Sequence, residues 1–215
     1  TIAQRLTRNR AQVAAEAMEV DDLVYAAPTI ADGAIAAPNG KFVIYLCSGP
    51  RREGDLASHL GKSGIGCLMV DTVLGSNALD LTSNQVADQL CALAANPKCV
   101  GVMASFPCST WSAARFEPGG PPIVRDVDNP DGIQDAQGRI ASEVLRANKL
   151  VSNGTRVISV ASDRGAICIV ECPASRGVGS QAPLIGRERH ASMMTYGPLA
   201  RWQTKAAADV TVFDQ

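Results

Sequence analysis

Short apolar runs that end at glycine, proline or acidic residues constrain the fold of this 215-residue chain more than any other feature. These runs are residues 42–47, 67–70, 100–104 and 166–170. Such runs are typical of strands that are buried on both faces, as in a parallel sheet. Polar or alanine-rich segments separate them. We therefore predict an α/β fold with a doubly wound, mostly parallel sheet and right-handed crossovers.

Helical patterns fill most of the intervals between the runs. The Thr-Ser-Asn sequence at residues 82–84 predicts the start of a helix that runs to residue 95. Alanine and leucine periodicity predicts a second helix over residues 136–161, interrupted at Asn153-Gly154. Further helices are predicted at residues 53–62 and 187–203, and a last strand at residues 209–213.

The chain divides at the first apolar run. Residues 1–40 begin with an alanine-rich stretch and continue into a segment with several prolines and glycines, so we treat them as an N-terminal arm and linker. A helix packed on the back of the domain is the alternative. Residues 41–215 form the predicted domain. Its last strand ends two residues before the chain does, so we expect the domain to be truncated at its C-terminus.

Composition narrows the classes of function. The net charge is −1 and aromatic residues make up 4%, so nucleic-acid contacts would need a local basic patch rather than a stacking platform. No apolar run is long enough to span a membrane. The seven cysteines form no Cys-x-x-Cys pair, which favours reduced thiols inside the cell, in cytoplasm or nucleus. Cysteine and histidine spacings offer no metal cage, so we expect no metal.

Ligands of open α/β sheets bind where strands end, so the residues after each run are the candidates for a site. Gly49, after the first run, lets the backbone approach a ligand, although a structural Gly-Pro turn explains it equally. Asp71, after the second, can accept both hydroxyls of a ribose, or be an exposed turn residue. Asp80 can meet an adenine amino group, or simply start the turn into the next helix.

Two further candidates follow the third and fourth runs. Cys108 lies on a strand-end turn beside Pro107 and is a candidate nucleophile, for which the nearby Arg115 could favour the thiolate. The alternative is a small buried cysteine. Glu171 ends the fourth run, where a carboxyl group is costly to bury unless it is paired or protonated. A protonated glutamate can bind a ring nitrogen of a base; a salt bridge to a loop arginine is the alternative.

In this order, these residues resemble the motifs of cytosine 5-methyltransferases, especially the compact methyltransferase-like domains of mobile elements and viruses. The matching segments are residues 46–49, Asp71, Asp80, residues 106–112 (Phe-Pro-Cys-Ser-Thr-Trp-Ser) and residues 171–175 (Glu-Cys-Pro-Ala-Ser). The resemblance covers residues 42–214 and implies a Rossmann-like fold that binds S-adenosylmethionine. The cofactor-binding residues would be Cys47, Ser48, Gly49, Asp71, Asp80 and Pro107.

The resemblance also implies a mechanism. Cys108 would add to C6 of cytosine while Glu171 holds the ring nitrogen and the exocyclic amine, and C5 would take the methyl group. Covalent attack divides one difficult step into easier ones, and the base must leave the duplex to be reached. Ser112 and Arg115 would contact the substrate. The resemblance implies a nucleic-acid partner, for which DNA is expected ahead of RNA. Other domains of a larger polyprotein are further expected partners.

Departures from the family motifs keep two alternatives open. Residues 50–53 stand where a second cofactor-loop glycine is usual, Cys172 replaces an asparagine, and residues 187–189 (Arg-Glu-Arg) follow Glu171 too soon for the family's arginine motif. One alternative is a catalytically degenerate domain that serves as a binding or assembly module. The other is a cysteine hydrolase, in which His190 would activate Cys108.

Overall fold

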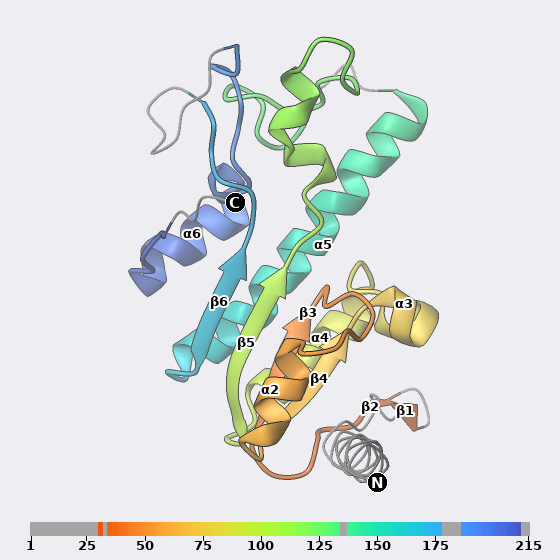
Figure 1. The fold of residues 1–215 in the computed structure, drawn as a ribbon, viewed down its shortest axis with the longest axis vertical. Helices are drawn as coiled ribbons and strands as arrows, with labels where there is room; N and C mark the ends of the chain where they lie inside the picture. Colours follow the sequence, from red (N-terminus) through yellow and green to blue (C-terminus); the bar gives the residue numbers. More distant parts are fainter. Residues whose placement is uncertain (1–29, 32–33, 134–136, 178–185, 212–215) are drawn as a thin grey trace, which may run out of the picture.

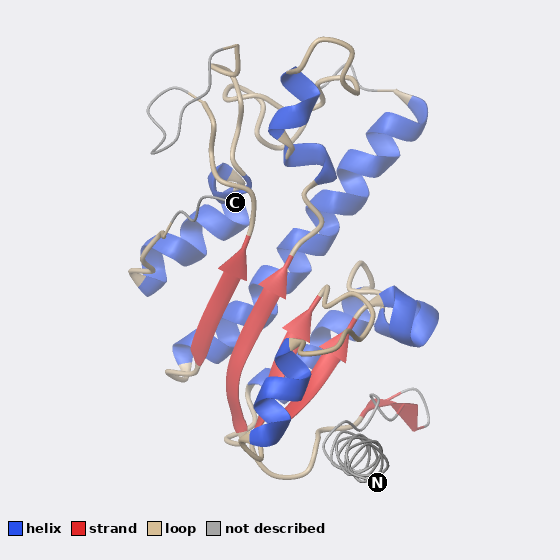
Figure 2. Ribbon diagram, viewed as in Figure 1, coloured by secondary structure: helices blue, strands red, loops and turns tan. Residues whose placement is uncertain are grey.

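A parallel sheet lies at the centre of the computed structural model, which describes residues 30–31, 34–133, 137–177 and 186–211. Its four strands are ordered β4-β3-β5-β6, and every neighbouring pair is parallel (Figures 1 and 2). They are β3 (Phe42–Leu46), β4 (Gly66–Val70), β5 (Cys99–Ser105) and β6 (Ile167–Glu171). The predicted α/β class with a parallel sheet is confirmed, and the arrangement is compatible with a Rossmann-like fold.

Helices pack on both faces of this sheet. Cys67 and Met69 of β4 are buried with Ala57 of α2 on one face. Leu68 and Val70, which alternate with them, belong to the main core on the other face. The four helices that pack on the sheet are α2 (Leu56–Lys62), α4 (Asn84–Ala94), α5 (Gly138–Asp163) and α6 (Gly197–Ala206). The main core joins the sheet to the last three of them, which lie behind the strands in Figure 1.

Capping side chains set where the first two of these helices begin. The Asp55 carboxylate accepts the backbone N–H of Ser58 at 2.9 Å, so α2 begins at Leu56 rather than at the predicted residue 53. In α4, the Ser83 side chain accepts the backbone N–H of Val86, which confirms the predicted start.

Helix α5 is continuous, so the predicted interruption at Asn153-Gly154 is wrong. The amide of Asn153 donates to the carbonyl of Leu81 at 2.9 Å and is buried there. Gly154 lies against the ring of Phe106, and a Cβ at this position would come within 2.4 Å of that ring. Both residues therefore serve the packing of the helix on the core and do not break it.

The C-terminal part also differs from prediction. Residues 186–192 form a loop, followed by the 3₁₀ helix η4 (Met193–Thr195), and α6 begins only at Gly197 with Pro198 in its first turn. Residues 209–211 are not in a strand, and the remainder of the predicted last strand, residues 212–213, lies outside the described residues.

Part of the predicted arm packs on the domain. The short strands β1 (Ile30–Ala31) and β2 (Ala34–Ile35) pair antiparallel. Ile35 is buried, and its N–H donates to the side chain of Gln89 on α4 at 3.0 Å. Residues 1–29 lie outside the described residues. Among the helices that are described, none has the length and apolar character needed to cross a membrane.

Strand β6 has one face without a covering helix in the described part of the chain. Ile167 and Ile169 are 70% and 52% exposed, whereas Cys168 and Val170 pack against the main core. Glu171 continues the exposed side of this alternation. Its exposure follows from the uncovered face of β6.

Candidate functional site

The carboxyl ends of all four strands lie at one edge of the sheet, which we call the carboxyl edge (Figure 2). Leu46 of β3 is level with Val70 and Ala104, and Ala104 is level with Val170. The chain passes from β3 to its neighbour β4 and then returns to β5 on the other side of β3. The boundary between β3 and β5 is therefore the topological switch point, where open α/β sheets usually bind ligands.

The loop after β3 is tied to the end of β4. The N–H of Cys47 donates to the carbonyl of Val70 at 2.8 Å. The N–H of Gly49 donates to Oδ2 of Asp71 at 3.0 Å, while Oδ1 of Asp71 accepts the N–H of Val73 at 3.1 Å. The structure thus brings together the predicted cofactor loop and the predicted ribose acid.

Backbone conformation in this loop is unusual. Cys47 has φ of +55°, which L residues other than glycine adopt at a cost of about 1–3 kcal/mol. Gly49 has φ of +68°, and no heavy atom lies within 4 Å of the Cβ it lacks. The hydroxyl of Ser48 donates locally to the Gly49 carbonyl at 3.1 Å. The loop therefore leaves backbone accessible beside Asp71.

The charges of two carboxylates act on the thiol of Cys47. Burial, and then the charges of Asp71 and Asp80, raise the pKa of this thiol to about 12. Cys47 is therefore a neutral thiol at neutral pH, and its position joins all three residues in one region of the carboxyl edge.

Asp80 has the contacts of a turn residue. Its Oδ1 accepts both the N–H and the hydroxyl of Thr82, at 2.9 and 2.8 Å, and its Oδ2 lies 3.4 Å from the guanidinium of Arg146. Although burial opposes it, these hydrogen bonds and the Arg146 charge lower the pKa of Asp80. These contacts agree with the alternative that Asp80 starts the turn into the next helix. Its contact with an adenine amino group stays a prediction.

Cys108 follows β5 and starts the 3₁₀ helix η2 (Ser109–Trp111). It is half-buried and packs against the edge of the main core, whereas Pro107 is exposed. Cys172 lies near it: burial, and then Glu171 and Cys108, raise the pKa of the Cys172 thiol to about 11. The Cys108 and Cys172 thiols therefore lie near each other at the ends of β5 and β6, whereas Glu171 belongs to the exposed side of β6.

Glu171 is exposed, contrary to the expectation of a buried carboxyl group that has to be paired or protonated. Among the residues that the structure describes, its side chain has no hydrogen bond or ion pair. The salt bridge to a loop arginine, the alternative considered from sequence, is therefore not formed within that part of the chain. Within the described residues, the carboxyl group is free to meet a ligand.

Ser112 and Arg115 mainly support the loop in which they lie. The Ser112 hydroxyl accepts the N–H of Ala114 and caps the 3₁₀ helix η3 (Ala113–Phe116). Arg115 donates to the carbonyl of Ser109 at 2.6 Å and to that of Pro122 at 2.7 Å. It also pairs with Glu143 on α5. Its guanidinium therefore holds backbone rather than approaching the Cys108 thiol.

His190 is a buried structural residue here. The N–H of Arg176 donates to its Nδ1 at 3.1 Å, so Nε2 carries the hydrogen and donates to the carbonyl of Trp111 at 2.8 Å. The pKa of His190 is lowered, chiefly because the ring is buried. With both ring nitrogens bonded to backbone, His190 cannot take a proton from Cys108 as a hydrolase requires.

Arg125 is a buried residue that the sequence did not single out. Its guanidinium carbon lies 3.7 Å from the centre of the Trp111 ring, and its Nε donates to Thr110 Oγ1 at 3.1 Å. A lone arginine in a loop rich in proline and aspartate resembles any exposed loop residue, so no signal in the sequence would have found it.

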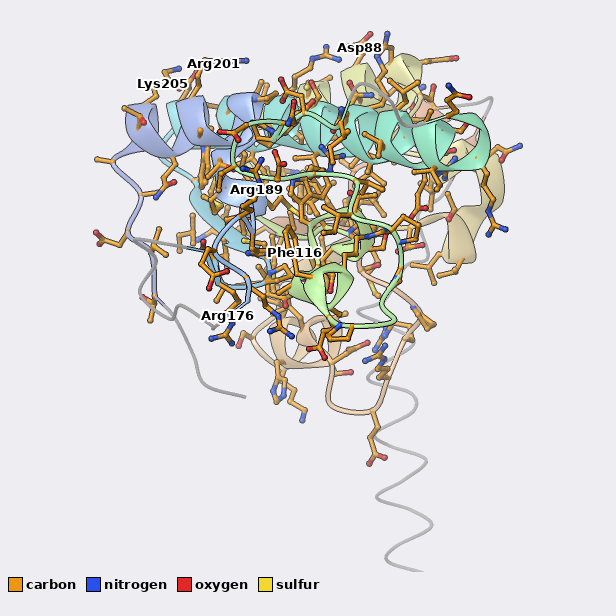
Figure 3. All side chains as sticks on the ribbon, turned by 90° about the horizontal axis from the view of Figure 1, so that it is seen from above. Asp88, Phe116, Arg176, Arg189, Arg201 and Lys205 are labelled. Carbon is orange, nitrogen blue, oxygen red and sulfur yellow. The ribbon has the colours of Figure 1, made fainter. Side chains whose placement is uncertain are left out.

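A small pocket of about 170 Å³ lies among the loops above the carboxyl edge. Figure 3, which views the molecule from above, labels Phe116 and Arg189 in its walls. Arg189 pairs with Asp126 and Asp128. The lining residues are Phe116, Ile123, Asp126, Gly186, Glu188 and Arg189, so none of the predicted site residues lines this pocket.

Comparisons with protein-family models, with curated proteins and with solved structures found no match for this chain. Among the described residues, no three histidine, cysteine or acidic side chains gather in a way that could hold a metal ion. The functional interpretation therefore depends on the residues of the carboxyl edge.

Proposed function

We propose that this chain is a methyltransferase-like domain that transfers a methyl group from S-adenosylmethionine to C5 of cytosine in DNA, with Cys108 as the nucleophile. One observation carries the proposal. The loop of Cys47 and Gly49 and the turn of Cys108 follow β3 and β5, the two strands that flank the switch point. A ligand bound there would contact both segments at once.

The residues after β3 and β4 fit an adenosine compound. Each oxygen of Asp71 accepts one backbone N–H, and a carboxylate oxygen can accept a second hydrogen bond from a ribose hydroxyl. The open side of Gly49 lets a ligand reach the backbone. When bound, the cofactor would supply an electrophilic methyl group. Asp71 and the backbone of residues 47–49 would hold it, with Ser48 and Pro107 at the margins.

The catalytic steps fall to Cys108 and Glu171. The Cys108 sulfur would form a bond to C6 of cytosine, which makes C5 nucleophilic, and the bond would break again when C5 loses its proton. Glu171, exposed at the end of the neighbouring strand β6, would hydrogen-bond the ring nitrogen and stabilise the charge that develops there. Cys172, as a neutral thiol, would not compete as a nucleophile.

Binding of the cofactor is tested by calorimetry on the whole chain. We expect measurable binding of S-adenosylmethionine that Asp71→Ala weakens about tenfold or more, because two buried hydrogen bonds to a ribose would be lost. The matched control is Asp88→Ala, which removes an exposed carboxylate paired with Arg156 on the surface. Absence of binding would instead favour the binding or assembly module.

Methyl transfer is tested on a cytosine-containing oligonucleotide with labelled cofactor. Cys108→Ser is expected to abolish transfer and keep cofactor binding, whereas Cys91→Ser on α4 is expected to change neither. Full turnover by Cys108→Ser would remove the nucleophile assignment. Because calorimetry and transfer are measured separately, a domain that binds the cofactor without catalysis is recognised as such.

A further inference from the structure

The turn that follows Cys108 is held by donors from three separate segments. In η2 (Ser109–Trp111), the carbonyl of the first residue accepts a hydrogen bond from Arg115 at 2.6 Å. The hydroxyl of the second residue accepts from Arg125 at 3.1 Å. The carbonyl of the third residue accepts from His190 at 2.8 Å. A turn of three residues is thus fixed at each of its positions.

Arg125 is the most extensively engaged of these donors. It is 2% exposed, and its guanidinium lies over the Trp111 ring at 3.7 Å from the ring centre. It also donates to the carbonyls of Pro130 at 2.7 Å and Val144 at 3.3 Å. Burial lowers its pKa to about 10, so it remains a cation at neutral pH. A desolvated cation over an indole face is a strong contact.

Trp111 transmits this contact to Cys108. Its backbone N–H donates to the carbonyl of Cys108 at 2.8 Å and closes the turn at that residue. Its ring packs edge-on against Tyr196, and its indole N–H has no acceptor within the described residues. The position of the ring therefore depends on the stack with Arg125 and on packing, and the same residue closes the turn at Cys108 through its backbone N–H.

We propose that Arg125 is a positioning residue, which fixes the Cys108 thiol for attack through Trp111 and Thr110. The proposal rests on Cys108 being the nucleophile of the proposed function. The planar guanidinium stacks on the ring and binds the hydroxyl at the same time, which a lysine ammonium cannot do. Without it, the turn at Cys108 opens locally, and the thiol becomes more accessible but less well oriented.

The test measures alkylation of individual cysteines by iodoacetamide, read by peptide mass spectrometry on the whole chain. For Arg125→Lys we expect the rate at Cys108 to rise about fivefold or more, with the rate at buried Cys67 unchanged, because only the local turn opens. In parallel, kcat for methyl transfer should fall about tenfold or more, with KM for the cofactor within about twofold. Global destabilisation would raise the rates at both cysteines.

Trp111→Phe is a milder variant that keeps an aromatic face, and we expect a smaller rise at Cys108. If Arg125→Lys does not fold, the same alkylation measurement on Trp111→Phe tests the proposal. Arg164→Lys is the matched control, since Arg164 holds the carbonyls of Ala94 and Cys99 at the opposite edge of the sheet. A Cys108 rate within about twofold of wild type in the folded variants overturns the proposal. Selective alkylation without methyl transfer in wild type would support the positioning role and refute the proposed function.

Discussion

Three thiols lie at the carboxyl edge, at residues 47, 108 and 172, and their surroundings separate them. The pKa of Cys47 is raised to about 12 and that of Cys172 to about 11, chiefly by burial and then by nearby carboxylates. At pH 8, about a thousandth of Cys172 or less would be thiolate, and less still of Cys47. We expect alkylation at pH 8 to modify Cys108 before either of them, as measured by peptide mass spectrometry. Faster modification of Cys172 would contradict this order.

His190 makes stability depend on pH. Its folded-state pKa is lowered by burial, so the unfolded chain binds the proton first as pH falls. The contribution of His190 to stability should therefore be constant above about pH 6.5, the pKa of unfolded histidine, and decline below it toward the folded-state pKa. Protonation of Nδ1 would also remove the hydrogen bond from Arg176. The measurement is the urea midpoint between pH 8 and pH 5.

His190→Gln provides the control for this pH dependence. A glutamine amide can replace the Nε2 donor toward the Trp111 carbonyl but does not titrate. We expect this variant to be less stable at pH 8 and to lose less stability on acidification than wild type. An equal acid-dependent loss in both proteins would assign the effect to other groups.

At the scale of elements, the middle of α5 is fixed by a close approach between Gly154 and Phe106. Helix propensity alone would make Gly154→Ala stabilising by about 1 kcal/mol. Because the new Cβ would lie 2.4 Å from the ring, we expect net destabilisation of about 1–3 kcal/mol instead. Urea unfolding measures the difference.

Gly197→Ala in α6 is the matched substitution. Its nearest neighbour is the end of the flexible Arg201 side chain at 3.1 Å, which can move aside. We expect a change within about 0.5 kcal/mol. If Gly154→Ala proved as harmless as this control, the close packing of α5 on Phe106 would be refuted.

The two faces of the sheet should respond differently to the same deletion. Ile44 of β3 is fully buried in the main core, so Ile44→Val should cost about 0.5–1.5 kcal/mol. Ile169 of β6 is 52% exposed, and Ile169→Val should change stability by less than about 0.5 kcal/mol. Equal losses in urea unfolding would mean that the exposed face of β6 is covered in solution.

Helices and strands could be predicted where a short stretch of sequence is enough to determine them. The apolar runs predicted the strands of the sheet, and the Ser83 cap predicted the start of α4. Prediction failed where contacts between residues far apart in the sequence determine the local structure. Asn153 and Gly154 look like a break in α5 until the partners at Leu81 and Phe106 are known. The loop at residues 186–192 looks helical by composition, yet its conformation depends on contacts with the rest of the chain.

At the scale of the whole molecule, the order of the strands determines which loops can share a ligand. The shift from β4 on one side of β3 to β5 on the other brings the Gly49 loop and the Cys108 turn to the same boundary. Alternation of strands and helices in the sequence was sufficient to predict this edge as the candidate site.

The side chains that stabilise the site could not be read from the sequence. Arg115 was expected to assist the thiol and instead binds backbone carbonyls. Arg125 and His190 hold the Cys108 turn from segments that are distant in sequence, and nothing in their local sequence indicates this. Contacts of this kind depend on how the loops meet, which only the folded molecule determines.

Trapping with 5-fluorocytosine tests most directly whether Cys108 attacks a cytosine ring. Fluorine at C5 cannot leave as a proton does, so the bond between sulfur and C6 would persist. With saturating S-adenosylmethionine and a single-stranded oligonucleotide that carries 5-fluorocytosine, we expect a covalent adduct whose cross-linked peptide maps to Cys108, and none with Cys108→Ser. If the wild-type chain binds the cofactor and the oligonucleotide yet forms no adduct, Cys108 does not attack the ring.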